Sequence, residues 1–375
     1  METEIQADYT YMGRTFTDLN INESSSSRTS TSTSASAFSD CDSDRSGEFT
    51  SSTDTRRRLL IACANSDNST SSSDDALIRN LIHNLDSSRS SVDDQKQAAM
   101  ELRLLAKNKP ENRLKIAQAG AIKPLISLIS SPDPHLVENG VTAILNLSLC
   151  DENKDLIVYS GAIKPLVKTL KIGSSTAKEN AACALLRLSQ TEENKALIGR
   201  SGAMPLLVNL LETGGMRGKK DAATALYSLC CVRENKVRAV EAGVMKTLVE
   251  MMADTGSAMV DKAAYVVGEL VGGGGVEARA ALVEEGGVPV VVEIVEVGTQ
   301  RQKEVAVGIL LQVCEESVAY RNMVAREGAI PPLVALSQSG TSRAKQKAET
   351  LIGLLRQPRS GNTAATTSDL STYQD

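Results

Sequence analysis

The sequence predicts an all-α protein that folds as a right-handed solenoid, in which similar helical units stack one on the next. The first observation is a recurring glycine, with steps of 41, 41, 41, 43 and 42 residues between Gly120, Gly161, Gly202, Gly243, Gly286 and Gly328. The second is that the last core position of each unit follows its glycine by 27 residues, at Leu147, Leu188, Leu229, Leu270, Val313 and Leu355. Length changes therefore fall in loops between units, because a packed core does not absorb an inserted residue.

Each unit contains three helical stretches, and the unit at 152–191 shows them most clearly. Residues 154–158 form a short amphipathic run that ends before Gly161, a residue suited to the positive φ of a tight corner. Pro165 then falls in the first turn of a second helix, where a missing N–H is tolerated. Residues 178–189 carry the apolar spacing of a longer third helix. Three helices in a repeat of this length indicate armadillo rather than two-helix HEAT units.

We expect three segments along the chain. Residues 1–74 should be disordered, because Ser and Thr dominate and too few apolar side chains are present to offset the entropy of ordering. Residues 75–358 should form the armadillo-repeat domain. It would begin with a capping unit, with helices near 76–85 and 92–106, and continue with six three-helix units. The Gly-, Thr- and Ser-rich residues 359–375 should again be disordered.

Composition and motifs argue against several classes of function. A net charge of −5 does not favour nucleic acid or anionic membranes, and no apolar run approaches the roughly 20 residues of a spanning helix. His83 and His135 are the only histidines, neither has a triad setting, and the seven cysteines form no Cys-x-x-Cys pair. We therefore predict no catalytic, cofactor-binding or metal-binding residues. Unpaired thiols and the lack of a secretory leader are typical of a cytoplasmic or nuclear protein, which we expect to be a monomer.

Residues from about 76 to 358 resemble the armadillo region of plant U-box ubiquitin ligases. The segments that carry the resemblance are KENAACALLRLS (178–189), RGKKDAATALYSL (217–229), MVDKAAYVVGEL (259–270) and EGAIPPLVALSQSGTSRAKQKA (327–348). The resemblance implies that the repeats bind substrates and receptor-like kinases, while a separate N-terminal U-box recruits the conjugating enzyme. No proline precedes Pro110, so the Cys-Pro-Ile-type motif of a U-box is missing, and we expect an armadillo-only relative.

Three functions of different classes remain open. The first is a non-catalytic adaptor that binds a protein segment, and the second is a component of a ubiquitin ligase. The third is a nuclear-import receptor, which needs a Trp and, four residues later, an Asn on successive third helices. The Trp column contains Thr142, Cys183, Thr224, Tyr265 and Gly308, and the Asn column contains Leu105, Asn146, Arg187, Ser228, Glu269 and Gln312. With no Trp and one Asn, the third function is disfavoured, while Asn146 and Arg187 remain candidate partner-binding residues.

A row of basic residues at the starts of third helices is the most specific candidate site. Arg217, Arg301 and Arg343 share one register position, and Lys178, Lys219, Lys303 and Lys345 share the position two residues later. Ala258 and Val260 interrupt the row in one unit. The alternative interpretation is a solvated rim with no binding role. Because Arg-x-Lys repeats in register in an acidic protein, we predict that the row binds an acidic or phosphorylated protein segment.

Overall fold

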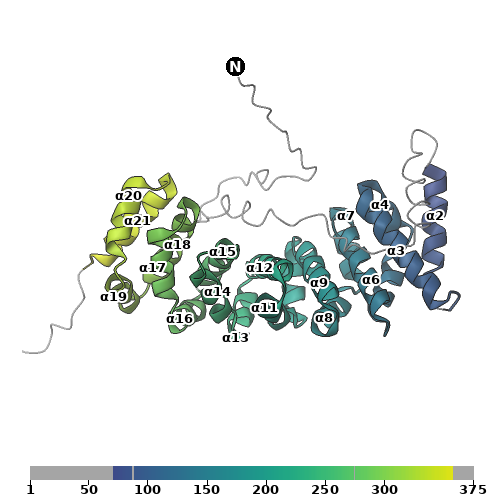
Figure 1. Ribbon diagram of the computed structural model, residues 1–375, viewed down its shortest axis with the longest axis horizontal. Helices are drawn as coiled ribbons and strands as arrows, with labels where there is room; N and C mark the ends of the chain where they lie inside the picture. The colour runs from purple at the N-terminus through teal and green to yellow at the C-terminus, as the bar shows by residue number, and fades with distance from the viewer. Residues whose placement is uncertain (1–70, 87, 274, 358–375) are drawn as a thin grey trace, which may run out of the picture. The chain divides into compact units, whose positions relative to one another are not determined.

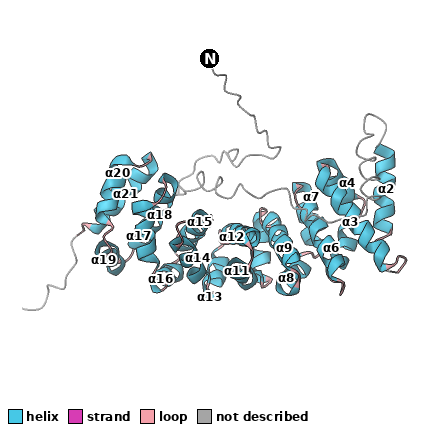
Figure 2. Cartoon of the chain, in the orientation of Figure 1, coloured by secondary structure: helices cyan, strands magenta, loops and turns pink. Residues whose placement is uncertain are grey.

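The structure is a computed structural model that describes residues 71–357, except for positions 87 and 274. All of these residues lie in the second of the chain's two compact units, which spans Ser66–Asp375. Residues 1–70 and 359–375, for which disorder was expected, lie outside the described ranges. Residues 71–74 were also expected to be disordered, but they form the start of helix α2 (Ser71–His83). Figure 2 shows that the described part consists of helices joined by short loops, without strands. None of its helices is long and apolar enough to cross a membrane.

The described helices form one two-helix unit followed by six three-helix units (Figure 1). The two-helix unit contains α2 (Ser71–His83) and α3 (Val92–Asn108). The first helices of the six units are α4 (Pro110–Gln118), α7 (Asp151–Tyr159), α10 (Glu192–Arg200), α13 (Arg233–Glu241), α16 (Val276–Glu284) and α19 (Val318–Arg326). The second helices are α5 (Ile122–Ile129), α8 (Ile163–Ile172), α11 (Ala203–Thr213), α14 (Val244–Ala253), α17 (Gly287–Val297) and α20 (Ile330–Ser339). The third helices are α6 (Pro134–Leu147), α9 (Ser175–Leu188), α12 (Met216–Leu229), α15 (Val260–Val271), α18 (Gln300–Cys314) and α21 (Ser342–Leu355).

The core of the stack lies between successive third helices and the second helices that pack against them. Each third helix from α3 to α21 contacts the next one, and each also contacts the second helix of its own unit. The predicted core positions Leu147, Leu188, Leu229, Leu270 and Val313 are fully buried, as expected. Leu355 is only half-buried, because no described helix packs beyond α21. The solenoid of three-helix units predicted from the sequence is confirmed.

The corner between first and second helices requires glycine for its backbone conformation. All six predicted corner glycines have positive φ, with values of 90°, 87°, 85°, 77°, 69° and 79° from Gly120 to Gly328. A Cβ added at any of them would meet no atom within 4 Å. Glycine is therefore needed because L-residues avoid this region of φ, and not because space is short.

We expect Gly161→Ala to lower the free energy of unfolding by about 1–2 kcal/mol, because alanine would be forced into the left-handed region. Gly353→Ala is the matched control, since Gly353 lies within α21 and its added Cβ also meets no atom within 4 Å. There the substitution should stabilise by about 0.5–1 kcal/mol, because alanine loses less conformational entropy in a helix. Urea unfolding measures both changes, and equal effects at the two positions would contradict the account.

The unit that contains α15 differs most from its neighbours. α15 has 12 residues, whereas the other third helices have 14 to 17. Its N-cap residue, Met259, provides no side-chain cap. The loop after it contains Gly272 and Gly273, the latter with a φ of 63°. The stability of a linear array is the sum of contributions from each unit and from each interface between neighbouring units. Because α15 is short, lacks a side-chain cap and precedes a glycine loop, we expect this unit and its interface with the next to be the least stable part of the array.

Hydrogen exchange should therefore begin earlier in residues 260–290 than in residues 140–230. The reason is that the glycine-rich loop gains more entropy on opening, while the shorter α15 has less helix to protect. Exchange measured by mass spectrometry on the intact chain resolves these segments. Uniform protection across both ranges would show that the loop does not weaken the array.

Candidate protein-binding surface

A buried asparagine near the start of the first helix joins four of the six three-helix units to the helices before them. Asn153 Nδ2 donates to the carbonyl of Leu147, at the end of α6, at 3.1 Å and to the carbonyl of Arg113, in α4, at 3.0 Å. Asn112, Asn194 and Asn235 occupy the same register position and are also buried. Each donates to a carbonyl at the end of the preceding third helix. These asparagines therefore have a structural role that the sequence pattern alone did not assign.

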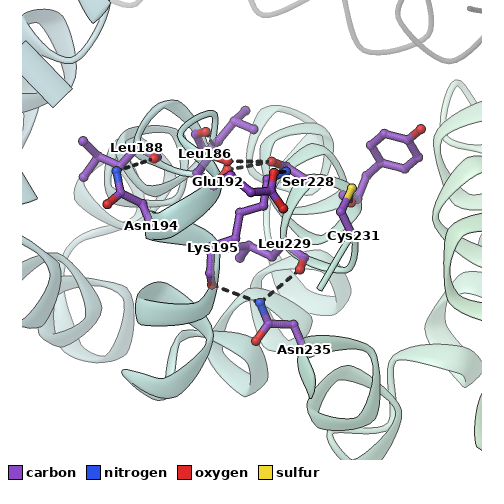
Figure 3. Close-up of polar contacts among 11 residues, drawn as sticks. Leu186, Leu188, Glu192, Asn194, Lys195, Ser228, Leu229, Cys231 and Asn235 are labelled. Atoms are coloured by element: carbon purple, nitrogen blue, oxygen red, sulfur yellow. Dashed lines mark hydrogen bonds and ion pairs between the residues drawn. The ribbon is translucent and has the colours of Figure 1, made fainter. Parts of the chain in front are cut away.

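Asn235 shows how completely such an amide is used (Figure 3). Its Nδ2 donates to the carbonyls of Leu229 and Lys195, both at 3.0 Å, and its Oδ1 accepts from Arg238 Nη1 at 3.0 Å. Gly199 in the preceding unit leaves room for it, because a Cβ there would lie 1.7 Å from Asn235 Oδ1. A fully hydrogen-bonded, buried amide is not available to bind a partner.

Asn235→Ala should lower the free energy of unfolding by about 2–4 kcal/mol, because two buried hydrogen bonds, from Asn235 Nδ2 to the carbonyls of Leu229 and Lys195, are lost. Asn209→Ala is the control, since Asn209 is an exposed residue within α11. That change should be neutral or slightly stabilising, because alanine has the higher helix propensity. Urea unfolding of both variants tests the role of the amide, which would be refuted by a neutral Asn235→Ala.

A basic residue follows the asparagine position in every unit, and in four units, at Arg113, Lys236, Arg279 and Arg321, it donates to carbonyls at the end of a third helix. Lys154 and Lys195 instead pair with Asp151 and Glu192 of their own helices. Arg321 Nε donates to the carbonyl of Cys314 at 2.7 Å, and Lys236 Nζ to that of Gly272 at 3.1 Å. A positive charge at this end of a helix is also favoured by the helix dipole. The four cations that bind helix ends belong to the stack.

The predicted candidates Asn146 and Arg187 lie on adjacent third helices. Asn146 is buried in α6, and its Nδ2 donates to the carbonyl of Arg103 in α3 at 2.9 Å. Arg187 is half-buried in α9, and its Nε has no hydrogen-bond partner among the described residues. Asn146 therefore contributes to the packing of the stack. The binding roles of both residues stay predictions.

Arg301 contacts the third helix of the preceding unit. Its Nε donates to the hydroxyl of Tyr265, on α15, at 2.9 Å, and its guanidinium carbon lies 5.4 Å from the centroid of the Tyr265 ring. This geometry is a cation–π contact. Tyr265 holds the register position that a tryptophan would occupy in a nuclear-import receptor, and here the chain's own arginine covers its ring.

Lys303 faces the opposite side of α18. Its Nζ donates to the carbonyl of Glu296, near the end of α17, at 2.8 Å, and its side chain lines a hollow with Pro331 and Pro332 of α20. Residues two apart on a helix differ by about 200° in direction, which is why Arg301 and Lys303 have different neighbours. The structure therefore splits the basic row into two surfaces. We name the side with Arg217, Arg301, Arg343, Tyr265 and Gly308 the ladder face.

Helix caps reduce one expected contribution to anion binding. The side-chain oxygens of Ser174, Thr299 and Thr341 accept hydrogen bonds from first-turn N–H groups of α9, α18 and α21. At α12 the N-cap residue is Gly215, which provides no side chain. Open N–H groups therefore contribute less at α9, α18 and α21 than the sequence suggested, although the helix dipoles still favour negative charge there.

The histidines and cysteines were the residues considered for catalysis or metal binding. His83 and His135 are exposed. Within the described ranges, no group of three or more His, Cys, Asp or Glu side chains is arranged to hold a metal ion. The described cysteines are all unpaired, and burial raises the pKa of the Cys314 thiol to about 12. A thiol with a raised pKa is a poor nucleophile near neutral pH.

Stacked three-helix units with a continuous row of third helices define an armadillo-repeat protein. The sequence matches the family described as "Plant U-box protein ARM repeat region" over residues 77–375. Because this match covers most of the chain, the protein belongs to that family.

Comparison with individual proteins agrees with this assignment. U-box domain-containing protein 2 of Arabidopsis thaliana is 60% identical over 254 residues, which are 68% of this chain and 35% of that protein. U-box domain-containing protein 3 of the same plant is 58% identical over 227 residues, 60% of this chain and 30% of that protein. The chain thus spans about a third of the length of these relatives. The crystal structure of an engineered protein, 26% identical, has a TM-score of 0.67 and covers 75% of this chain and 68% of its own.

Proposed function

We propose that the protein is a non-catalytic adaptor that binds a segment of another protein along its ladder face. The observation that carries this proposal is the arrangement of the arginines. Arg301 is held against Tyr265 of the preceding unit, so its register position points along the row of third helices. Arg217 and Arg343 share that position in other units. Meanwhile the asparagines of the first helices are used within the stack.

The partner segment should be acidic or phosphorylated. Arginine presents several donors in a planar arrangement that suits carboxylate and phosphate groups. The N-terminal ends of the third helices lie at the same register and add a favourable dipole. A basic segment, as a nuclear-import receptor would bind, fits less well, because Arg301 already covers the ring of Tyr265.

A second candidate function is the substrate-binding part of a ubiquitin ligase. It is favoured by the similarity to U-box domain-containing proteins. The resemblance of the repeats to the U-box ligase family also implies receptor-like kinases as partners. Incubation of the full chain with ubiquitin, activating enzyme and a conjugating enzyme tests whether the chain is itself a ligase. The adaptor predicts no self-ubiquitination, whereas ubiquitin chains on the purified protein would replace the adaptor by a ligase.

An array of synthetic peptides tests the adaptor directly. The full chain should bind acidic or phosphorylated peptides in preference to neutral and basic ones, and more weakly as salt rises. Replacing Arg217, Arg301 and Arg343 together by Gln should weaken binding about tenfold or more, because charge-assisted hydrogen bonds are lost.

The matched control replaces Lys219, Lys303 and Lys345 by Gln, which removes the same charge from the other side of the third helices. This variant should retain binding to within about threefold, a loss expected from screened long-range charge alone. Equal losses in both variants would show that net charge, and not the ladder face, determines binding. Preference for basic peptides would overturn the proposed partner chemistry.

A further inference from the structure

Two cations lie one turn apart on the ladder face of the last third helix. Arg343 is exposed in the first turn of α21, and Lys347 follows four residues later, half-buried. Like charges at this spacing on a helix repel each other. Arg301 of α18 has the same register position as Arg343, but its guanidinium lies against Tyr265 of α15. The end of the ladder face therefore concentrates positive charge.

Gly308 of α18 leaves a gap that the Lys347 ammonium approaches. A Cβ added at Gly308 would lie 3.1 Å from Lys347 Nζ. The same Nζ is 3.5 Å from the carbonyl oxygen of Glu304, a long hydrogen bond. Gly308 holds the Trp position of the register, so a larger side chain there would push the lysine away. Here the gap brings the ammonium close to α18.

The carboxylate that faces this lysine already has another partner. Glu304 is buried, and its Oε2 accepts a hydrogen bond from the Thr341 hydroxyl at 2.6 Å. Burial lowers the pKa of Lys347 from its usual value, Glu304 opposes this shift, and Arg343 adds to it. Lys347 is thus a cation whose charge is incompletely balanced by its surroundings, and a further anion would stabilise it.

We propose that Arg343 and Lys347, with the Lys347 ammonium beside Gly308 of α18, form a subsite for one anionic side chain of the bound segment. The ligand is a carboxylate or a phosphate monoester. This proposal rests on the adaptor function proposed above and names the place where a single charged residue of the partner is held. Lys347 was not among the candidates from the sequence, because the basic row was defined by two register positions and Lys347 occupies neither.

The subsite is tested by peptide binding to the full chain, measured by fluorescence anisotropy. The probes are fluorescein-labelled hexaglutamate, hexaglutamine, and a glycine-serine hexapeptide with one phosphoserine. The variant Arg343→Gln/Lys347→Met removes both charges and keeps an apolar side chain in place of the half-buried stem of Lys347. It should bind the preferred anionic probe about tenfold or more weakly than the wild type, with no fall in melting temperature.

A control variant separates the subsite from net charge. Lys168 and Lys171 are exposed on α8, and Lys168→Gln/Lys171→Met removes the same charge from a second helix. Its binding should change by less than about twofold. If the wild type binds neither anionic probe, both the adaptor and the subsite are refuted. If the wild type binds one and Arg343→Gln/Lys347→Met binds it equally, the subsite alone is refuted. The probe that binds more tightly identifies carboxylate or phosphate as the ligand.

The pKa of Lys347 gives an independent readout. Lysines carrying 13C-methyl groups are followed by NMR, and the Lys347 signal is identified by its loss in Lys347→Met. In the free protein it should titrate below the exposed lysines. Saturation with the preferred anionic probe should raise its pKa, because the anion favours the charged form, with Glu304 and Arg343 still facing it. An unchanged titration in the saturated complex would place the anion elsewhere.

Discussion

A buried asparagine amide at the start of a first helix is the interaction on which the stacking of the units depends. The carbonyls at the C-terminus of a third helix lack the i+4 donors of the helix interior. Those of Leu147 and Leu229 accept one hydrogen bond from the turn that follows, from the N–H groups of Cys150 and Val232, and a second from the asparagine. In Asn153 and Asn235, Nδ2 donates both to such a carbonyl and to a carbonyl of the preceding first helix. One side chain thereby links three helices from two units.

In the last two units an arginine is the donor to the end of the third helix, and it binds the carbonyl one residue after the position that an asparagine reaches. Ala278 and Tyr320 occupy the asparagine position, and the arginine after each supplies the donor. Arg279 binds the carbonyl of Val271, and Arg321 that of Cys314. What is retained is therefore the hydrogen-bonding requirement of the helix end, rather than one residue type. Since these donors lie on the first helices, they do not occupy the ladder face of the third helices.

The sequence was sufficient for features that depend on backbone conformation and burial. Corner glycines such as Gly161 and core positions such as Leu188 follow from the fixed repeat, and the structure has them in the expected conformation and burial. The direction of polar side chains was not predictable in the same way. Arg301 and Lys303 looked like one row, but the neighbours that separate them, on α15 and α17, become adjacent only in the folded stack. The gap at Gly308 likewise exists only between two packed helices.

Photo-crosslinking measures most directly whether recognition takes place on the ladder face. A benzophenone amino acid is placed at Thr350, an exposed residue two turns after Arg343 on α21, and in a second protein at Lys168 on α8. Both are irradiated with an acidic peptide and analysed by mass spectrometry. The account predicts crosslinking at position 350 and none at position 168. Crosslinking at position 168 alone, or equally at both, would contradict it.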